Sequence, residues 1–169
     1  MADPGEFDAF VVARSKTLLQ AAWLLTGDWQ LAEDLLQTAL AKSYLAWARI
    51  RHDGDPEGYV RRVLFTTYIT WWRRRWRSET PTSTLPDRPD SRDAFTQVDL
   101  RDAVVQALAG LPRRQRAVVV LRYYCDLSEA ETAHVLSCSV GAVKSQAAKG
   151  LNRLRNSRLA ESIHEGTPR

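Results

Sequence analysis

This chain has few cysteines and lacks both a long apolar run and the basic start of a secretory signal. It has two cysteines, Cys125 and Cys138, in 169 residues, which is too few for a disulfide framework or a zinc site with four cysteines. Its longest apolar run falls far short of the ~20 residues that span a bilayer. The first ten residues, MADPGEFDAF, lack the basic start of a secretory signal. We expect an intracellular, cytoplasmic protein that keeps its thiols reduced and does not insert into a membrane.

A cluster of residues suited to catalysis is also lacking. The three histidines, at positions 52, 134 and 164, are scattered along the chain. No paired carboxylates and no His/Cys cluster fall in a plausible site. We therefore expect no enzymatic activity, no cofactor and no metal.

Positive charge is modest overall but unevenly distributed. The chain has 24 basic and 20 acidic residues. Two basic blocks, 51–77 with a net charge of +4 and 101–169 with +5, flank an acidic block, 78–100, with −3. The acidic block also holds three prolines among Ser, Thr and Asp residues, a composition that disfavours a helix. We interpret this block as a flexible linker, which gives domains at 1–77 and 99–169 and a linker at 78–98.

Outside this linker the apolar residues recur at helical spacing. In the first domain the pattern predicts helices over 6–25, 30–50 and 56–77. Gly27 would end the first helix, while Asp28 and Asp55 would cap the second and third. Trp71 is expected in the core at the end of the third helix. With no useful strand-like alternation, the sequence predicts an all-α fold of two small helical domains.

The second predicted helix carries a small, polar strip opposite its apolar stripe. Asp34, Gln37, Thr38 and Ala41 are spaced i, i+3, i+4 and i+7, so they share one face. Leu35 begins to turn toward this strip. It would provide an apolar anchor ringed by hydrogen-bonding groups, which is a common form of binding hot spot.

The third predicted helix ends in TWWRRRWR, where tryptophans and arginines interleave. Arginine donates forked hydrogen bonds to phosphate, and tryptophan offers a flat face to an unstacked base. Trp72 and Trp76 share a face that continues from Phe65 and from Tyr68 or Ile69. Alternatively, the tryptophans are core residues and the arginines a solvated helix end. The candidate nucleic-acid residues are Arg61, Arg62, Trp72, Arg73, Arg74, Arg75 and Trp76.

Residues 128–154 predict two helices joined by a tight turn. Ser128 and Glu131 have capping-box spacing, Ser137–Ser139 would form the turn, and Ser139 would cap the second helix. Small, amide and basic side chains then share the outward face of that helix, which is the geometry of major-groove readout. An ordinary helical hairpin with a solvated face is the alternative. The candidate residues are Ala142, Lys144, Ser145, Gln146, Lys149 and Arg153.

Together the two halves resemble a short bacterial sigma factor of the extracytoplasmic-function (ECF) group, with regions 2 and 4 only. AEDLLQTAL, at 32–40, is similar to the region 2.2 signature AEDLVQETF, and 56–75 is similar to regions 2.3 and 2.4. The stretch from 111 to 155 is similar to region 4. In all, the resemblance covers about 7–77 and 99–156.

This resemblance implies a non-catalytic subunit that gives RNA polymerase its promoter specificity. Asp34, Leu35, Gln37 and Thr38 would dock on the β′ clamp helices of the core enzyme. The 51–58 loop and the third helix would open and hold the −10 element. Region 4 would bind the β flap and read the −35 element. The implied partners are core RNA polymerase, promoter DNA and an anti-sigma factor.

Several positions depart from the family pattern. Thr38 stands where the family usually has Glu, Ser137 where it has Gly, and Ala142 where it has Thr. Gln146 and Lys149 replace arginines on the DNA face, so the promoter preference of relatives does not carry over to this chain.

Three other functions are compatible with parts of the sequence. A helix-turn-helix regulator that binds DNA without joining the polymerase explains 99–156 but leaves the Asp34 strip and the Trp/Arg helix without a role. A helical interaction module would use the basic faces to bind acidic proteins and would not contact DNA. An enzyme acting on nucleic acid would need the catalytic cluster that the sequence lacks.

Overall fold

The computed structural model describes the backbone of residues 3–78 and 96–157, and the side chains of 3–71 and 101–157. The predicted linker at 78–98 therefore lies almost wholly outside the described residues. Its last three positions, however, already belong to a helix that begins at Thr96. This helix begins seven residues after the last proline of the predicted linker, Pro89.

Helices account for all the regular structure in the described parts of the chain, which contain no strand. The first half comprises α1 (Pro4–Thr26), α2 (Trp29–Leu45), α3 (Trp47–Asp53) and α4 (Pro56–Ser78). The second half comprises α5 (Thr96–Ala109), α6 (Arg113–Val119), the π-helical turn η1 (Val120–Tyr124), α7 (Glu129–Leu136) and α8 (Val140–Arg155). The predicted all-α fold is confirmed.

Local side-chain chemistry sets where the helices of the first half begin and end. Asp28 accepts a hydrogen bond from the amide of Leu31 at 3.0 Å, and Asp55 accepts one from the amide of Gly58 at 2.9 Å. Both aspartates satisfy amides that a helix start leaves without partners. Gly27 follows α1 with φ 71°, a left-handed conformation that glycine adopts without steric cost. These predicted boundaries are confirmed.

The second predicted helix is instead two helices. α2 ends at Leu45 and α3 begins at Trp47, with Ala46 between them at φ −101° and ψ 3°. The break turns Trp47 into the core, where it is 3% exposed and packs on Phe7 and Phe10 at ring-centroid distances of 5.1 and 5.2 Å. Because neither Gly nor Pro is present at the break, we attribute the change in helix direction to the burial of Trp47.

α4 is buried around more of its circumference than one apolar stripe predicts. Phe65 and Tyr68, which helical spacing aligns with the candidate nucleic-acid residues Trp72 and Trp76, are fully buried. They are buried because α4 packs against α2 on one side and against α6 and α7 on another. Trp71, expected in the core, is half-buried at its edge.

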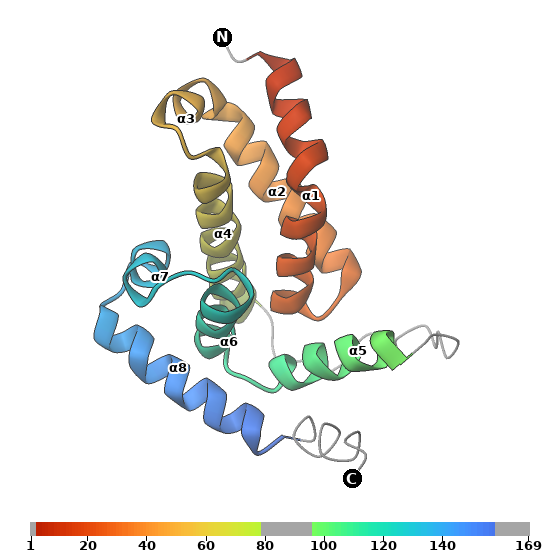
Figure 1. Cartoon of the computed structure of the whole chain (residues 1–169), viewed down its shortest axis with the longest axis vertical. Helices are drawn as coiled ribbons and strands as arrows, with labels where there is room; N and C mark the ends of the chain where they lie inside the picture. Colours follow the sequence, from red (N-terminus) through yellow and green to blue (C-terminus); the bar gives the residue numbers. More distant parts are fainter. Residues whose placement is uncertain (1–2, 79–95, 158–169) are drawn as a thin grey trace.

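The two halves pack against each other through a continuous apolar core. α5 crosses below the end of α1, and α7 lies beside α4 (Figure 1). The guanidinium of Arg116, on α6, donates to the carbonyl oxygen of Leu25 in α1 at 2.7 Å. It also donates to the carbonyls of Ala109 and Leu111, at 3.0 and 3.1 Å. Arg116 is 8% exposed, so a buried cation bridges the halves, a contact that the sequence did not predict.

Candidate nucleic-acid and partner interfaces

α7, the turn after it and α8 form the predicted helix-turn-helix. Ser128 Oγ accepts from the amide of Glu131 at 3.1 Å, and Glu131 Oε2 accepts from the amide of Ser128 at 2.7 Å. These reciprocal bonds hold the pKa of the Glu131 carboxyl below its usual range. Ser139 Oγ accepts from the amide of Ala142 at 3.0 Å and starts α8. The predicted capping box and N-cap are confirmed.

Close packing fixes the direction of α8. Val143 is fully buried and Ala147 is 9% exposed. At Gly150 an added Cβ would lie 2.9 Å from Val119 Cγ2, so glycine allows α8 to approach α6 more closely than another residue would. The opposite face of α8 is thereby held outward. Of the six residues predicted on it, Lys144, Ser145, Lys149 and Arg153 are exposed, and Ala142 and Gln146 are half-buried.

Lys144 lies at one edge of this outward face. Its ammonium is 3.9 Å from the carboxylate of Glu129 at the start of α7, so the pair links the two helices of the motif. The pair is partly exposed, and exposed pairs of this kind contribute little to stability.

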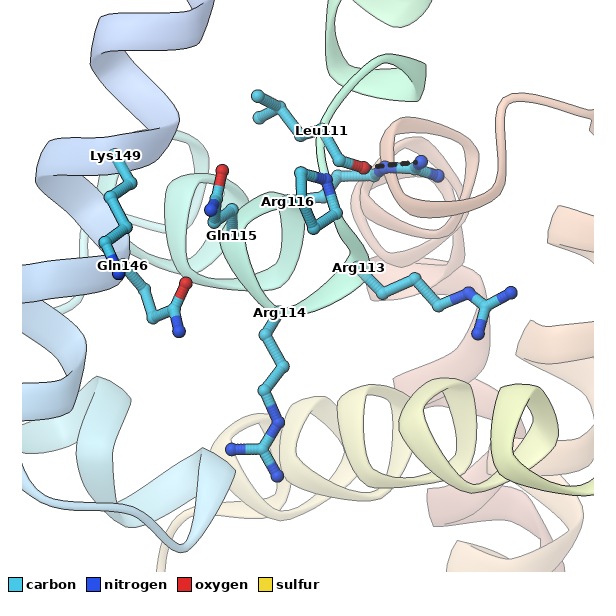
Figure 2. A pocket seen from close by; sticks show the side chains of 8 residues that line it. Leu111, Arg113, Arg114, Gln115, Arg116, Gln146 and Lys149 are labelled. Atoms are coloured by element: carbon cyan, nitrogen blue, oxygen red, sulfur yellow. Dashed lines mark hydrogen bonds between the residues drawn. The ribbon is translucent and has the colours of Figure 1, made fainter. Parts of the chain in front are cut away.

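A basic groove of about 710 Å³ lies between the start of α6 and α8. Arg114, Gln146 and Lys149 surround its opening, whereas the guanidinium of Arg116 points to the far side of α6 (Figure 2). Arg113 and Arg114 were missed by the sequence analysis. Their signal was present in LPRRQR, but the groove depends on how α6 meets α8, which local spacing does not reveal.

The arginines near the start of α4 are engaged within the protein. Arg61 pairs with Glu57 at 3.1 Å, and Arg62 Nη1 lies 3.3 Å from His134 Nε2 on α7. The helix-turn-helix therefore contacts the predicted −10 surface at Arg62, whose side chain remains exposed. The side chains of the remaining candidates, Trp72, Arg73, Arg74, Arg75 and Trp76, lie outside the described residues.

The outer strip of α2 (Asp34, Gln37, Thr38 and Ala41) lies on the surface, with Thr38 half-buried and the others exposed. Thr38 Oγ1 donates to the Asp34 carbonyl at 2.8 Å. Leu35, in contrast, is fully buried, so its placement as a surface anchor was wrong. Its position adjoins the inward face of α2, and packing against α1 and α4 draws its side chain into the core.

Comparison with known proteins assigns these elements to two regions. Residues 10–78 match the family model for Sigma-70 region 2, and residues 101–154 match that for Sigma-70, region 4. The order of the two regions defines a sigma factor of the sigma-70 class. The RNA polymerase sigma-E factor of Streptomyces coelicolor is 40% identical over 94% of this chain and 89% of its own length. The ECF RNA polymerase sigma factor SigM of Mycobacterium tuberculosis is 30% identical over 95% and 80%. The chain belongs to the ECF RNA polymerase sigma factors.

The fold is also that of a solved sigma factor. The sigma factor RpoE, crystallised with the anti-sigma factor NepR from Bartonella quintana, is 21% identical and superposes with a TM-score of 0.71. The match covers 92% of this chain and 97% of that one, so it spans both halves. No helix in the described ranges is long and apolar enough to cross a membrane.

Proposed function

We propose that this sigma factor docks on core RNA polymerase through the outer strip of α2, reads a −35 element with α8 and opens the −10 element with α4. The observation that carries the proposal is the presence on one chain of two separate surfaces. An exposed polar strip lies in the first half, and a helix-turn-helix with a basic face lies in the second. A DNA-binding regulator has no use for the strip, whereas a polymerase subunit needs both.

Readout of the −35 element is supported by the chemistry of α8 and its groove. Gln146 suits the adenine edge, and Lys149 suits guanine or phosphate. Arg114 lies across the groove from them, where its guanidinium would contact a backbone phosphate. Phosphate contacts position a protein on the duplex, and base contacts specify the sequence. We therefore assign Arg114 to affinity, and Gln146 and Lys149 to promoter choice.

The −10 role of α4 requires the halves to separate. Arg62 is in contact with His134 of the helix-turn-helix, and a promoter strand would have to displace that contact. We infer that the arrangement described here is the form that does not engage the promoter. Arg61 and Arg62 would then become available when the factor opens on the polymerase.

An anti-sigma factor is the partner we propose for the closed arrangement. The solved sigma factor with this fold is bound to its anti-sigma factor, and the likeness extends across both halves. A protein that binds only the closed form would draw the equilibrium away from polymerase binding. The proposed role lies in the cytoplasm, where the polymerase acts, and involves no catalytic step by this chain.

Charge reversal at Asp34 tests the docking strip. Asp34→Arg replaces attraction to a basic partner with repulsion, and because the side chain is exposed the fold should persist. Glu33→Arg is the matched control, since Glu33 is exposed on the same turn but lies outside the strip. Asp34→Arg should fail to co-purify with core polymerase and fail to start transcription, while Glu33→Arg does both. Equal core binding by wild type and Asp34→Arg would overturn the docking proposal.

A further inference from the structure

The last residue of α2 presents a large apolar side chain to solvent. Leu45 is 88% exposed, the highest value among the exposed large hydrophobic side chains of the described residues. It follows Asp34 by eleven positions, Thr38 by seven and Ala41 by four. Residues at these spacings lie on one face of a helix. Leu45 therefore continues the outer strip of α2 rather than standing apart from it.

Packing within the protein does not account for this leucine. The buried positions of α2 are Ala32, Leu35, Leu36, Ala39, Leu40 and Ser43, all on the side away from the strip. Leu45 is also not an isolated apolar residue. Tyr44 beside it is 41% exposed, with its ring edge-on to Phe7 at 5.0 Å. Ala41, one turn earlier, is exposed as well.

The chemistry of the strip therefore changes along the length of α2. Its start is acidic and hydrogen-bonding, with Asp34 accepting from Gln30 Nε2 at 3.3 Å. Its end is apolar. The neighbouring cation, Lys42, does not alter this end, because its ammonium turns toward α4 and donates to Thr67 Oγ1 at 3.2 Å. An apolar side chain beside hydrogen-bonding groups is the composition of a binding hot spot.

We propose that Leu45 is the apolar anchor of the polymerase-docking strip, the role that the sequence had suggested for Leu35. The inference rests on the proposed docking function of α2 and names what the partner must present. That partner is an extended rigid element of core RNA polymerase, with a basic side chain opposite Asp34 and an apolar pocket opposite Leu45. Eleven residues of helix span about 16 Å, so the two features must be separated by about that distance.

Core-binding titrations with fluorescently labelled sigma factor test the anchor. Leu45→Gln removes the apolar contact and retains a good helix former, so affinity for core polymerase should fall by about tenfold or more. Leu45→Met retains an apolar side chain and should bind within about threefold of wild type. Val12→Gln is the matched control, because Val12 is 83% exposed on a different helix. Its affinity should be unchanged.

The outcomes separate the anchor from the strip. If Asp34→Arg abolishes binding while Leu45→Gln binds as wild type does, the anchor is refuted and the docking function stands. If neither variant loses affinity, both proposals fail. Sedimentation of the free protein tests whether a second copy of this chain, rather than the polymerase, binds at Leu45. Dimerisation of the wild type that Leu45→Gln removes, with core binding unchanged, would overturn the anchor in favour of self-association.

Discussion

The positive φ angle of Ser137 is expected to lower the stability of the protein. It ends α7 with φ 53° and ψ 47°, a left-handed conformation that costs a residue with a Cβ about 1–2 kcal/mol. Members of the family that the sequence resembles usually have glycine at this turn position. Glycine pays no such cost but loses about 0.5–1 kcal/mol in additional chain entropy, so the two effects partly offset each other.

Ser137→Gly should therefore stabilise the protein by about 0.5–1 kcal/mol. Urea unfolding followed by circular dichroism would measure the change. Ser137→Ala keeps the Cβ and should give no gain, which separates backbone strain from loss of the hydroxyl. Ser128→Gly, at the N-cap of the same helix, should be slightly destabilising. A Ser137→Gly variant no more stable than Ser137→Ala would contradict the argument.

The thiol of Cys125 should react slowly with alkylating reagents in the folded protein. Burial raises the pKa of its thiol to about 11, and the thiolate is the nucleophile. In a Cys138→Ser background, iodoacetamide at about pH 8 should label Cys125 slowly in native protein and rapidly in urea. Because the folded pKa is raised, the associated stability is complete below the unfolded value near 9 and is lost as pH rises toward 11. Labelling at equal rates in both states would refute the assignment.

Residue-level prediction succeeded for capping and failed for burial. Asp28, Ser128 and Ser139 are capping residues whose chemistry is local, so the sequence sufficed to find them. Leu35 and Leu45 show the limit. Both are leucines near the strip, but one is buried and the other is 88% exposed. The difference arises from which neighbours pack on α2 and from where that helix ends, and neither is encoded in local spacing.

At the scale of elements, the residues of α8 that pack against the protein lie on a different face from the candidate DNA-recognition residues. Its inward residues and Gly150 set its distance from α6, while most of its outward residues are exposed. Helix existence and the outward face were predictable because both follow from a 3.6-residue period. The break at Ala46 and the turn η1 were not, because each depends on tertiary packing and neither is marked by Gly or Pro.

Substitutions on the recognition face should change promoter choice without unfolding the helix. Gln146→Ala and Lys149→Ala each remove a proposed base contact, worth ~1–3 kcal/mol. Run-off transcription with core polymerase on a panel of −35 variants should show altered preference, with unchanged core binding. Arg155→Ala is the control, since Arg155 is an exposed cation at the end of α8 outside the recognition face. An unaltered preference in both variants would mean that this face does not read the promoter.

At the scale of the whole molecule, two halves predicted to be joined by a linker form one packed body. The sequence identified both halves and their separate chemistry. It could not predict their contact, because the bridging cation, Arg116, bonds to backbone carbonyls rather than to a side chain of complementary charge. The apolar residues at the contact are also those that each half needs for its own core. The contact between the halves therefore cannot be predicted from the sequence of either half taken alone.

The Arg116 bridge predicts how the halves behave once the chain between them is cut. Limited proteolysis should cleave first within 79–95, where the sequence is rich in proline and charge. In the wild type the two fragments should then co-elute on gel filtration, held by the shared core and the bond to the Leu25 carbonyl. Arg116→Met leaves the buried carbonyls of Leu25 and Leu111 without their donor, at a cost of ~1–3 kcal/mol each, and also removes the part-buried bond to the Ala109 carbonyl, so its fragments should separate. Arg114→Met, an exposed arginine two positions away, should leave them associated.

A second variant distinguishes loss of contact from loss of fold, because Arg116 also bonds within its own half. The Tyr124 hydroxyl donates across the contact to Gln20 at 2.8 Å, and Tyr124 is 39% exposed. Tyr124→Phe should therefore keep full helical circular dichroism and weaken fragment association by the ~0.5–1.5 kcal/mol of one hydrogen bond. Wild-type fragments that separate on cleavage would show that the halves do not hold each other. Arg116→Met fragments that co-elute as firmly as those of Arg114→Met would show that the buried cation does not hold the closed form together.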